Sequence, residues 1–267
     1  AEPVPGAAYG MIRRRCRRAV ALAFTILGCI LRAGLKRLRG PLTPIERAKW
    51  LRRSAQKVLA AAGIEWRVMG APPARGLVVS NHLSYLDVAA LAAAMPCAFV
   101  SKIEVSRWPV FGLLARLAGS IFIDRGSRAS AEGVALEIAG RLSSAVPILV
   151  FPEGTSSDGT QVLRFHSRLF EPAVAAGAPI TAAAVGYAAD CELPEPELCW
   201  FGDEPFLPNL WKILRVECLC AQVVFGESRS YPNREAAARE TRAEVEAIRA
   251  FHQGAGHAEV REAVTLL

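Results

Sequence analysis

The sequence lacks the cysteine patterns that indicate a zinc site or a disulfide framework. Its seven cysteines are an odd number, none forms a C-x-x-C pair, and no Cys-His spacing typical of zinc occurs. Cys218 and Cys220 lie in an apolar, strand-like run, where both side chains point to one face. We therefore expect reduced, mostly buried thiols in a cytosolic environment, and no metal or other bound cofactor.

A long uncharged run and an obvious signal-peptide cleavage site are also missing. The segment AVALAFTILGCIL, residues 19–31, holds 13 uncharged residues, whereas a spanning helix needs roughly 20. Basic residues flank it on both sides, which favours the cytoplasmic leaflet. We expect a helix that lies on the membrane or inserts shallowly, at the cytoplasmic face of the inner membrane. The alternative is a helix that packs on the domain itself.

The excess of positive charge is confined to the N-terminus. The net charge is +7, and residues 1–45 hold nine basic side chains and one acidic one, whereas the remainder holds 23 basic and 24 acidic side chains. A neutral body argues against a nucleic-acid partner, and a basic, apolar N-terminus favours an anionic lipid surface. A disordered basic tail is the alternative.

A second helix is predicted over residues 44–62. Thr43 can cap it, Pro44 suits the first helical position, Glu46 completes a capping box, and Gly63 can end it. The two helices form a basic amphipathic N-terminal pair. We therefore divide the chain into a membrane-associating segment, residues 1–62, and an α/β domain, residues 63–267.

Short apolar runs alternate with helical stretches in the rest of the chain. Such alternation is typical of an α/β fold with a mostly parallel sheet flanked by helices. We predict strands at residues 76–80, 97–100, 120–124, 147–151, 180–185 and 216–225. The predicted helices run from about residue 82 to 94 and over residues 108–118, 130–142, 171–176 and 234–251.

The heptapeptide NHLSYLD, residues 81–87, follows a predicted strand and carries the first candidate chemistry. One ring nitrogen of His82 can take a proton from a hydroxyl, while Asp87 binds the other nitrogen and fixes the tautomer. No G-x-S-x-G elbow is present, so we expect the nucleophile to be a hydroxyl of the substrate. The alternative is a helix cap formed by Asn81 beside an incidental histidine.

Three further motifs lie at or near predicted strands. GSIFIDR, residues 119–125, ends in an arginine that suits phosphate recognition, although a core strand with a solvated arginine looks the same. FPEGTS, residues 151–156, forms a tight turn that can present Glu153 and backbone N–H groups. GAPITAAAV, residues 177–185, is an apolar strand that shapes a site rather than reacting.

In this order and spacing, the motifs N-H-x-x-x-x-D and F-P-E-G-T resemble those of the glycerolipid acyltransferases, which include 1-acylglycerol-3-phosphate acyltransferase. The resemblance covers about residues 76–187. It implies transfer of a fatty acyl group from acyl-CoA or acyl-carrier protein, as co-substrate, to the free hydroxyl of lysophosphatidic acid, giving phosphatidic acid. It implies that His82 and Asp87 are catalytic, and that the substrate-binding residues are Asn81, Ser84, Arg125, Arg128, Glu153, Gly154, Thr155 and Arg168.

The chain departs from the family after the F-P-E-G-T motif. Many members have an F-K-x-G segment there, whereas this chain has Phe165, His166, Ser167 and Arg168. The acceptor therefore stays open, with lyso-ornithine lipid or another lysophospholipid as the alternative. A catalytically silent lipid-binding protein and a thioester hydrolase are the two other classes of function.

Overall fold

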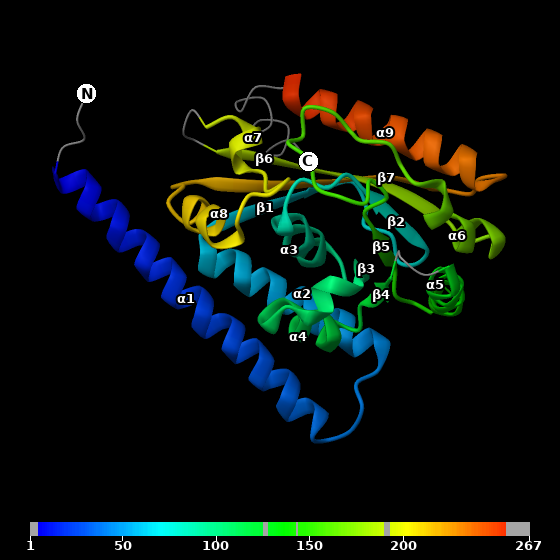
Figure 1. Cartoon of the computed structure of the whole chain (residues 1–267), viewed down its shortest axis with the longest axis horizontal. Coiled ribbons are helices and arrows are strands. Elements are labelled where there is room, and N and C mark those ends of the chain that lie inside the picture. The colour runs from blue at the N-terminus through cyan, green and yellow to red at the C-terminus, as the bar shows by residue number, and fades with distance from the viewer. Residues whose placement is uncertain (1–4, 125–127, 143, 190–192, 255–267) are drawn as a thin grey trace.

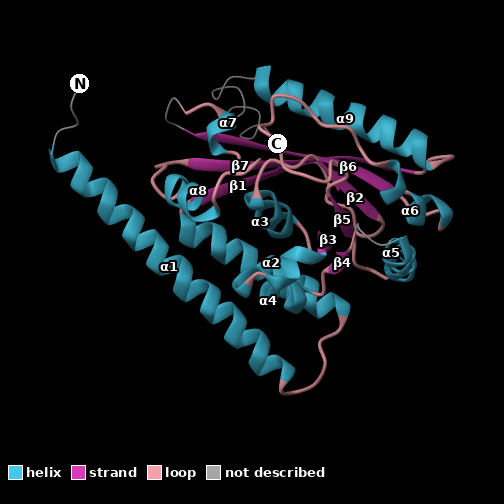
Figure 2. Ribbon diagram, in the orientation of Figure 1, coloured by secondary structure: helices cyan, strands magenta, loops and turns pink. Residues whose placement is uncertain are grey.

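A seven-stranded sheet runs through the centre of the protein, with helices on both faces (Figures 1 and 2). The computed structural model describes residues 5–124, 128–142, 144–189 and 193–254. The strands are β1 (Ile64–Met69), β2 (Leu77–Ser80), β3 (Ala98–Lys102), β4 (Ile121–Ile123), β5 (Ile148–Val150), β6 (Ile180–Ala189) and β7 (Leu219–Arg229). The predicted α/β class is confirmed.

The helices in the described ranges are α1 (Pro5–Arg37), α2 (Pro44–Ala62), α3 (Tyr85–Ala94), α4 (Pro109–Ala118), α5 (Arg128–Leu142), α6 (Glu171–Ala175), α7 (Glu195–Leu198), α8 (Phe206–Ile213) and α9 (Arg234–Gly254). Two short 3-10 helices, η1 (Ile103–Arg107) and η2 (Ser167–Leu169), complete the set. We did not predict β1, α7 or α8.

The strand order is β1-β7-β6-β2-β5-β3-β4, and every pairing is parallel except β6 with β7. Strands β2 and β5 are parallel neighbours, with Val79 opposite Val150. The segments that follow these two strands therefore emerge at the same edge of the sheet. Sites of open α/β sheets usually lie at this carboxyl edge.

Each central strand is buried on both faces, which explains its continuous apolar sequence. In β2, Val78 packs in the core on the side of α2, α3 and α8, whereas Leu77 and Val79 pack on the side of α5, α6 and α9. Both faces of these strands are therefore covered by helices and shielded from solvent.

Side chains that reach backbone carbonyls join the two N-terminal helices to each other and tie α1 to the body. Trp50 on α2 donates from its indole Nε1 to the carbonyl of Cys29 on α1 at 3.1 Å. Arg18 on α1 donates to the carbonyls of Leu214 and Glu217, beyond α8. The predicted capping box of Thr43 and Glu46 is present at the start of α2.

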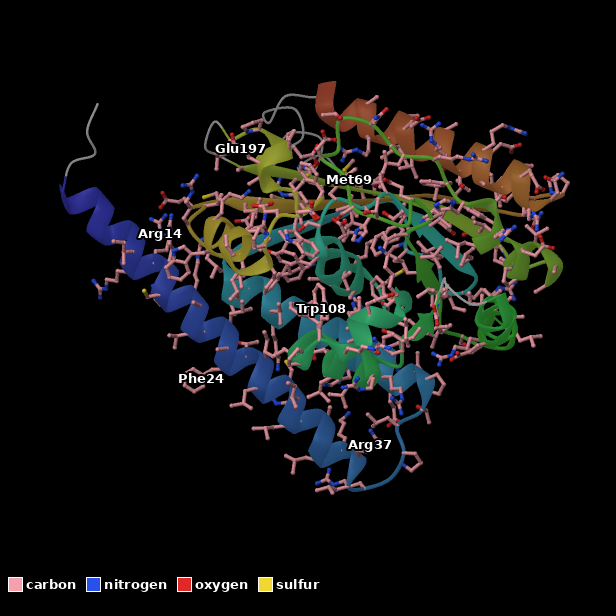
Figure 3. The ribbon with its side chains drawn as sticks, viewed as in Figure 1. Arg14, Phe24, Arg37, Met69, Trp108 and Glu197 are labelled. Carbon is pink, nitrogen blue, oxygen red and sulfur yellow. The ribbon has the colours of Figure 1, made fainter. Side chains whose placement is uncertain are left out.

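Helix α1 is longer than its uncharged run, because it continues through both basic flanks. By length and composition alone, Ile12–Arg37 could cross a membrane. One face of the helix packs on α2 and α4 through Cys29 and Ala33. The other face exposes an apolar stripe made of Val20, Phe24, Leu27, Leu31 and Leu35. Figure 3 shows Phe24 pointing away from the protein body.

A buried ion pair holds the C-terminal helix to the sheet. Arg249 on α9 is 4% exposed and donates to Glu195 Oε2 at 2.7 Å. It also donates to the carbonyls of Val185 and Gly159, each at 2.7 Å. These bonds satisfy the buried guanidinium and join α7, α9, β6 and the segment around Gly159.

We expect Arg249→Met to lower the free energy of unfolding by about 3–5 kcal/mol, because it leaves the carboxylate of Glu195 in a buried site without its partner. The matched control on the same helix is Arg234→Met, which removes an exposed pair with Glu171 and should cost less than about 1 kcal/mol. Urea denaturation followed by tryptophan fluorescence measures both. Equal losses would contradict the assignment of Arg249 as a buried anchor.

Candidate active site

His82 and Asp87 meet at the carboxyl edge of the sheet, directly after β2. Nδ1 of His82 lies 2.7 Å from Oδ2 of Asp87, and the Asp87 side chain is fully buried while the histidine side chain is 22% exposed. A carboxylate accepts, so Nδ1 carries the proton and Nε2 keeps its lone pair. The pair is arranged as a base with its orienting carboxylate.

The same carboxylate starts helix α3. Ser84 is the N-cap residue and Asp87 is its capping-box partner at the third helical position. Oδ2 of Asp87 accepts the backbone N–H groups of Leu83 at 2.6 Å and Ser84 at 2.9 Å. The capping bonds of helix α3 therefore fix the position of the Asp87 carboxylate independently of its hydrogen bond with His82.

The backbone and the ring of His82 are held from the β5 side. Its N–H donates to Oε1 of Glu153 at 3.1 Å, and its carbonyl accepts the N–H of Ser157 at 2.9 Å. The imidazole stacks on the ring of Phe151, with centroids 4.1 Å apart and planes 15° apart. These contacts leave the imidazole little freedom, which preorganises it for proton transfer.

Asn81 locks the turn between β2 and α3 to β6. Its side-chain amide donates to the carbonyl of Val185 at 3.0 Å and accepts the N–H of the same residue at 2.8 Å. Asn81 and Ser84 are both buried. The substrate-binding role expected for these two residues stays a prediction, whereas the bonds described here position His82.

Glu153 is buried in the turn after β5, with 4% exposure. In the part of the chain that the structure describes, its Oε2 atom is buried without a hydrogen-bond partner. Burial raises the pKa of Glu153 to about 7, against the lowering effect of the hydrogen bond from the His82 N–H. The carboxyl group of Glu153 therefore changes its charge near neutral pH beside His82 and Asp87.

The other residues predicted to bind substrate are Gly154, Thr155, Arg168, Arg125 and Arg128. Gly154 follows Glu153 with a φ of 76°, a conformation that favours glycine, and Thr155 is exposed. Arg168 is exposed on η2, and the N–H of neighbouring His166 donates to the carbonyl of Pro152 at 2.9 Å. Arg125 and the side chain of Arg128 lie outside the described residues.

One residue of the site was missed by the sequence reasoning. The hydroxyl of Tyr187, on β6, donates a hydrogen bond to Oδ1 of Asp87. Tyr187 lies two residues beyond the apolar block that we expected only to shape the site. Its polar tip in an otherwise apolar strand is the signal that was available.

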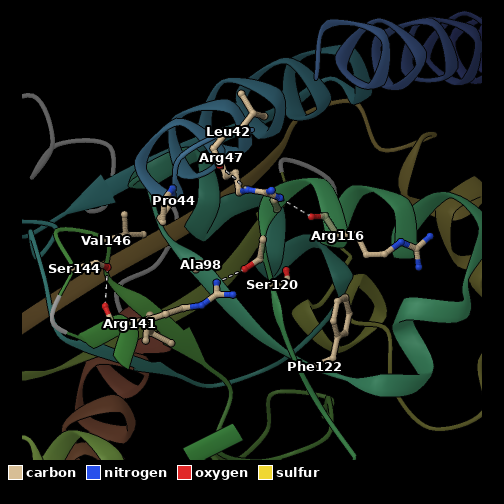
Figure 4. A pocket seen from close by; sticks show the side chains of 13 residues that line it. Leu42, Pro44, Arg47, Ala98, Arg116, Ser120, Phe122, Arg141, Ser144 and Val146 are labelled. Atoms are coloured by element: carbon tan, nitrogen blue, oxygen red, sulfur yellow. Dashed lines mark hydrogen bonds between the residues drawn. The ribbon is translucent and has the colours of Figure 1, made fainter. Parts of the chain in front are cut away.

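A separate cavity of about 410 Å³ lies at the opposite edge of the sheet (Figure 4). Ala98 and Ile148 line it, and they begin β3 and β5. Two of its arginines serve helix ends, because Arg47 donates to the carbonyl of Arg116 and Arg141 donates to the carbonyl of Gly119. This cavity is therefore distinct from the site around His82.

In the described parts of the chain, no group of three or more His, Cys, Asp or Glu side chains is arranged to bind a metal ion. The chemistry available at the site is that of a general base, its orienting carboxylate and a buried carboxyl group.

Comparison with known proteins agrees with this geometry. The sequence model of the family described as Acyltransferase matches residues 68–186. The lyso-ornithine lipid O-acyltransferase of Pseudomonas aeruginosa is 36% identical over 211 residues, which cover 77% of this chain and 81% of that protein. The 1-acyl-sn-glycerol-3-phosphate acyltransferase of Neisseria meningitidis is 34% identical over 226 residues, which cover 81% and 83%.

A solved structure shares the fold. The crystal structure of the 1-acyl-sn-glycerophosphate acyltransferase PlsC from Thermotoga maritima superposes with a TM-score of 0.68 and 17% identity, over 91% of this chain and 98% of that chain. The chain therefore has the same fold as that protein. The sequence relatives go further, and this chain belongs to the acyltransferase family, whose members here are O-acyltransferases of lyso-lipids.

The raised pKa of Glu153 predicts a pH-dependent cost of folding. In the unfolded chain this carboxyl loses its proton near its ordinary value of 4.5, whereas in the folded protein it keeps the proton to about pH 7. Stability is therefore lost as pH rises through this interval, by on the order of 3 kcal/mol at most. The glutamine of Glu153→Gln cannot ionise. The free energy of unfolding of this variant, relative to that of the unchanged protein, should therefore increase as the pH rises from about 5 to 8.

The change in this difference with pH is the readout, because any packing cost of the glutamine is independent of pH. Urea denaturation at several pH values measures it. Glu104→Gln, at an exposed carboxylate on η1, serves as the control. A Glu153→Gln curve that runs parallel to that of the unchanged protein would show that Glu153 is ionised throughout.

Proposed function

We propose that the protein transfers a fatty acyl group from a thioester, acyl-CoA or acyl-carrier protein, to the free hydroxyl of a lyso-lipid at a membrane surface. The observation that carries the proposal is the contact between His82 and the buried Asp87 in a chain of this family. The partners are the acyl donor, the lyso-lipid acceptor and the membrane, with no metal, cofactor or nucleic acid.

In the proposed step, Nε2 of His82 takes the proton of the acceptor hydroxyl as its oxygen attacks the thioester carbonyl carbon. Asp87 orients the imidazole and stabilises its charged form. The tetrahedral intermediate then loses the thiolate, which takes the proton back from His82, and the new ester is complete. Backbone N–H groups near the strand ends stabilise the oxyanion. No acyl-enzyme forms.

Lysophosphatidic acid is the first proposed acceptor. Its phosphate would be bound by Arg125, Arg128 and Arg168, with Glu153, Gly154 and Thr155 on the glycerol side. The support is the family's motif pattern and the hydrogen bond from His166 to Pro152, which places the segment before Arg168 next to the turn of Glu153. Guanidinium groups suit phosphate recognition.

Lyso-ornithine lipid is the second proposed acceptor, and two observations favour it. The relatives include several lyso-ornithine lipid O-acyltransferases, 33–40% identical to this chain. The family's lysine and glycine are replaced here by His166 and Arg168. A head group with an amine and a carboxylate in place of a phosphate would require such a change in the residues around it.

Helix α1 is the proposed attachment to the membrane, at the cytoplasmic face of the inner membrane. Its exposed stripe of apolar residues provides buried area in lipid, and its arginines can bind anionic head groups. This attachment brings a lipid acceptor to the same surface as the enzyme.

His82→Ala should lower kcat about 10²–10⁴-fold, because it removes the proposed general base. The assay supplies radiolabelled acyl-CoA with a panel of lyso-lipids that includes lysophosphatidic acid and lyso-ornithine lipid. The lyso-lipid that becomes labelled identifies the acceptor, free fatty acid indicates a hydrolase, and no turnover indicates a lipid-binding protein. Near-normal transfer by the variant would rule out His82 as the base.

The double variant Phe24→Asp and Leu31→Asp should release the protein from anionic vesicles. Both residues are exposed, at 71% and 57%, so the fold should survive the substitutions. The control is Leu136→Asp, at an apolar side chain on α5 that is 75% exposed, which should leave flotation with the vesicles unchanged. Undiminished binding of the double variant would exclude α1 as the attachment.

A further inference from the structure

Tyr187 is hydrogen-bonded to Asp87, the carboxylate partner of His82. It is 6% exposed, and its hydroxyl donates to Oδ1 of Asp87. The family motifs quoted above do not include this residue. It reaches the site from β6, 100 residues after Asp87 in the sequence.

The two oxygens of Asp87 have separate partners. Oδ2 accepts from His82, Leu83 and Ser84, whereas Tyr187 is the hydrogen-bond donor that the described residues place on Oδ1. A fully buried carboxylate needs both oxygens satisfied. The tyrosine hydroxyl therefore fixes the rotation of the carboxylate that aims Oδ2 at Nδ1 of the histidine.

Tyr187 is itself held in place from the far side of the sheet. Its backbone N–H donates to Oε1 of Glu195 at 2.8 Å, and Glu195 is paired with Arg249. Its ring packs in the core shared by α2, α3 and the sheet. A chain of hydrogen bonds from Arg249 on α9 through Glu195 therefore holds the backbone of Tyr187 in place.

We propose that Tyr187 is a positioning residue of acyl transfer, which sets the orientation and the effective charge of Asp87 and through it the basicity of His82. This role rests on the proposed function of His82 as the general base. Burial raises the pKa of Tyr187 well above its ordinary value, so the hydroxyl keeps its proton and remains a donor at working pH. A donor on Oδ1 withdraws negative charge from the carboxylate and so weakens its hold on a protonated imidazole.

Other charged or titratable groups face Asp87 and Tyr187 from neighbouring elements. Removal of the Tyr187 hydroxyl alone leaves all of these groups in place. They are Glu153 in the turn after β5, Asp158 in the following loop, Glu195 on α7, Cys199 after α7 and Arg249 on α9.

The test is Tyr187→Phe, which deletes one oxygen and keeps the ring. We expect kcat/KM to fall about tenfold, chiefly through kcat. The acid limb of its pH profile should move to higher pH by roughly half a unit to one unit, because the imidazole facing a more negative carboxylate takes up a proton more readily. Incorporation of 3-fluorotyrosine at the same position, a stronger donor, should move the limb the opposite way.

The matched control is Tyr85→Phe. Its hydroxyl also makes an interior hydrogen bond, which goes to Oδ1 of Asn209 at 3.0 Å rather than to Asp87. This variant should lose thermal stability and keep the midpoint of the acid limb. If Tyr187→Phe also keeps that midpoint while His82→Ala is inactive, the inference about Tyr187 is wrong and the proposed function stands. If His82→Ala remains active, the proposed function itself fails.

Discussion

The buried carboxylate of Asp87 is the constraint on which the rest of the site depends. A charge with no exposure must be surrounded by donors, because an unpaired one is too costly to bury. Here the donors are His82, Leu83, Ser84 and Tyr187. One carboxylate therefore completes the capping box of helix α3 and orients the imidazole of His82, so the start of the helix and the geometry of the site depend on the same group.

Local signals in the sequence predicted the parts of the fold that local interactions determine. The capping box and the terminal glycine gave both ends of α2, and the apolar runs located β2 to β7 with errors of a few residues at their ends. The pair of His82 and Asp87 was predicted from its position after a strand and from the motif resemblance, and the structure adds that the Ser84 cap of α3 lies between the two residues. The uncharged run understated α1, because arginines at a helix surface do not interrupt the helix.

What the sequence did not indicate depends on contacts between distant segments. In β1, Ile64 is buried and the other five residues are partly or fully exposed, and among the described residues the strand pairs with β7, which follows it by some 150 residues. Tyr187 and Arg249 are ordinary in their own segments, and only the folded chain brings them to Asp87 and Val185. Such long-range partners are set by sheet topology rather than by local propensity.

The co-occurrence of the two most specific motifs has a mechanical explanation in this structure. The side chain of Glu153 accepts the N–H of His82, and the N–H of Ser157 donates to the carbonyl of His82. The segment after β5 therefore holds the His82 backbone on both sides. Parallel pairing of β2 and β5 brings the two segments together, although 71 residues separate them. A change in either motif would therefore move His82. The buried glutamate thus holds the His82 peptide whether or not it also contacts an acceptor, and the clamp links the F-P-E-G-T turn to the position of one imidazole ring.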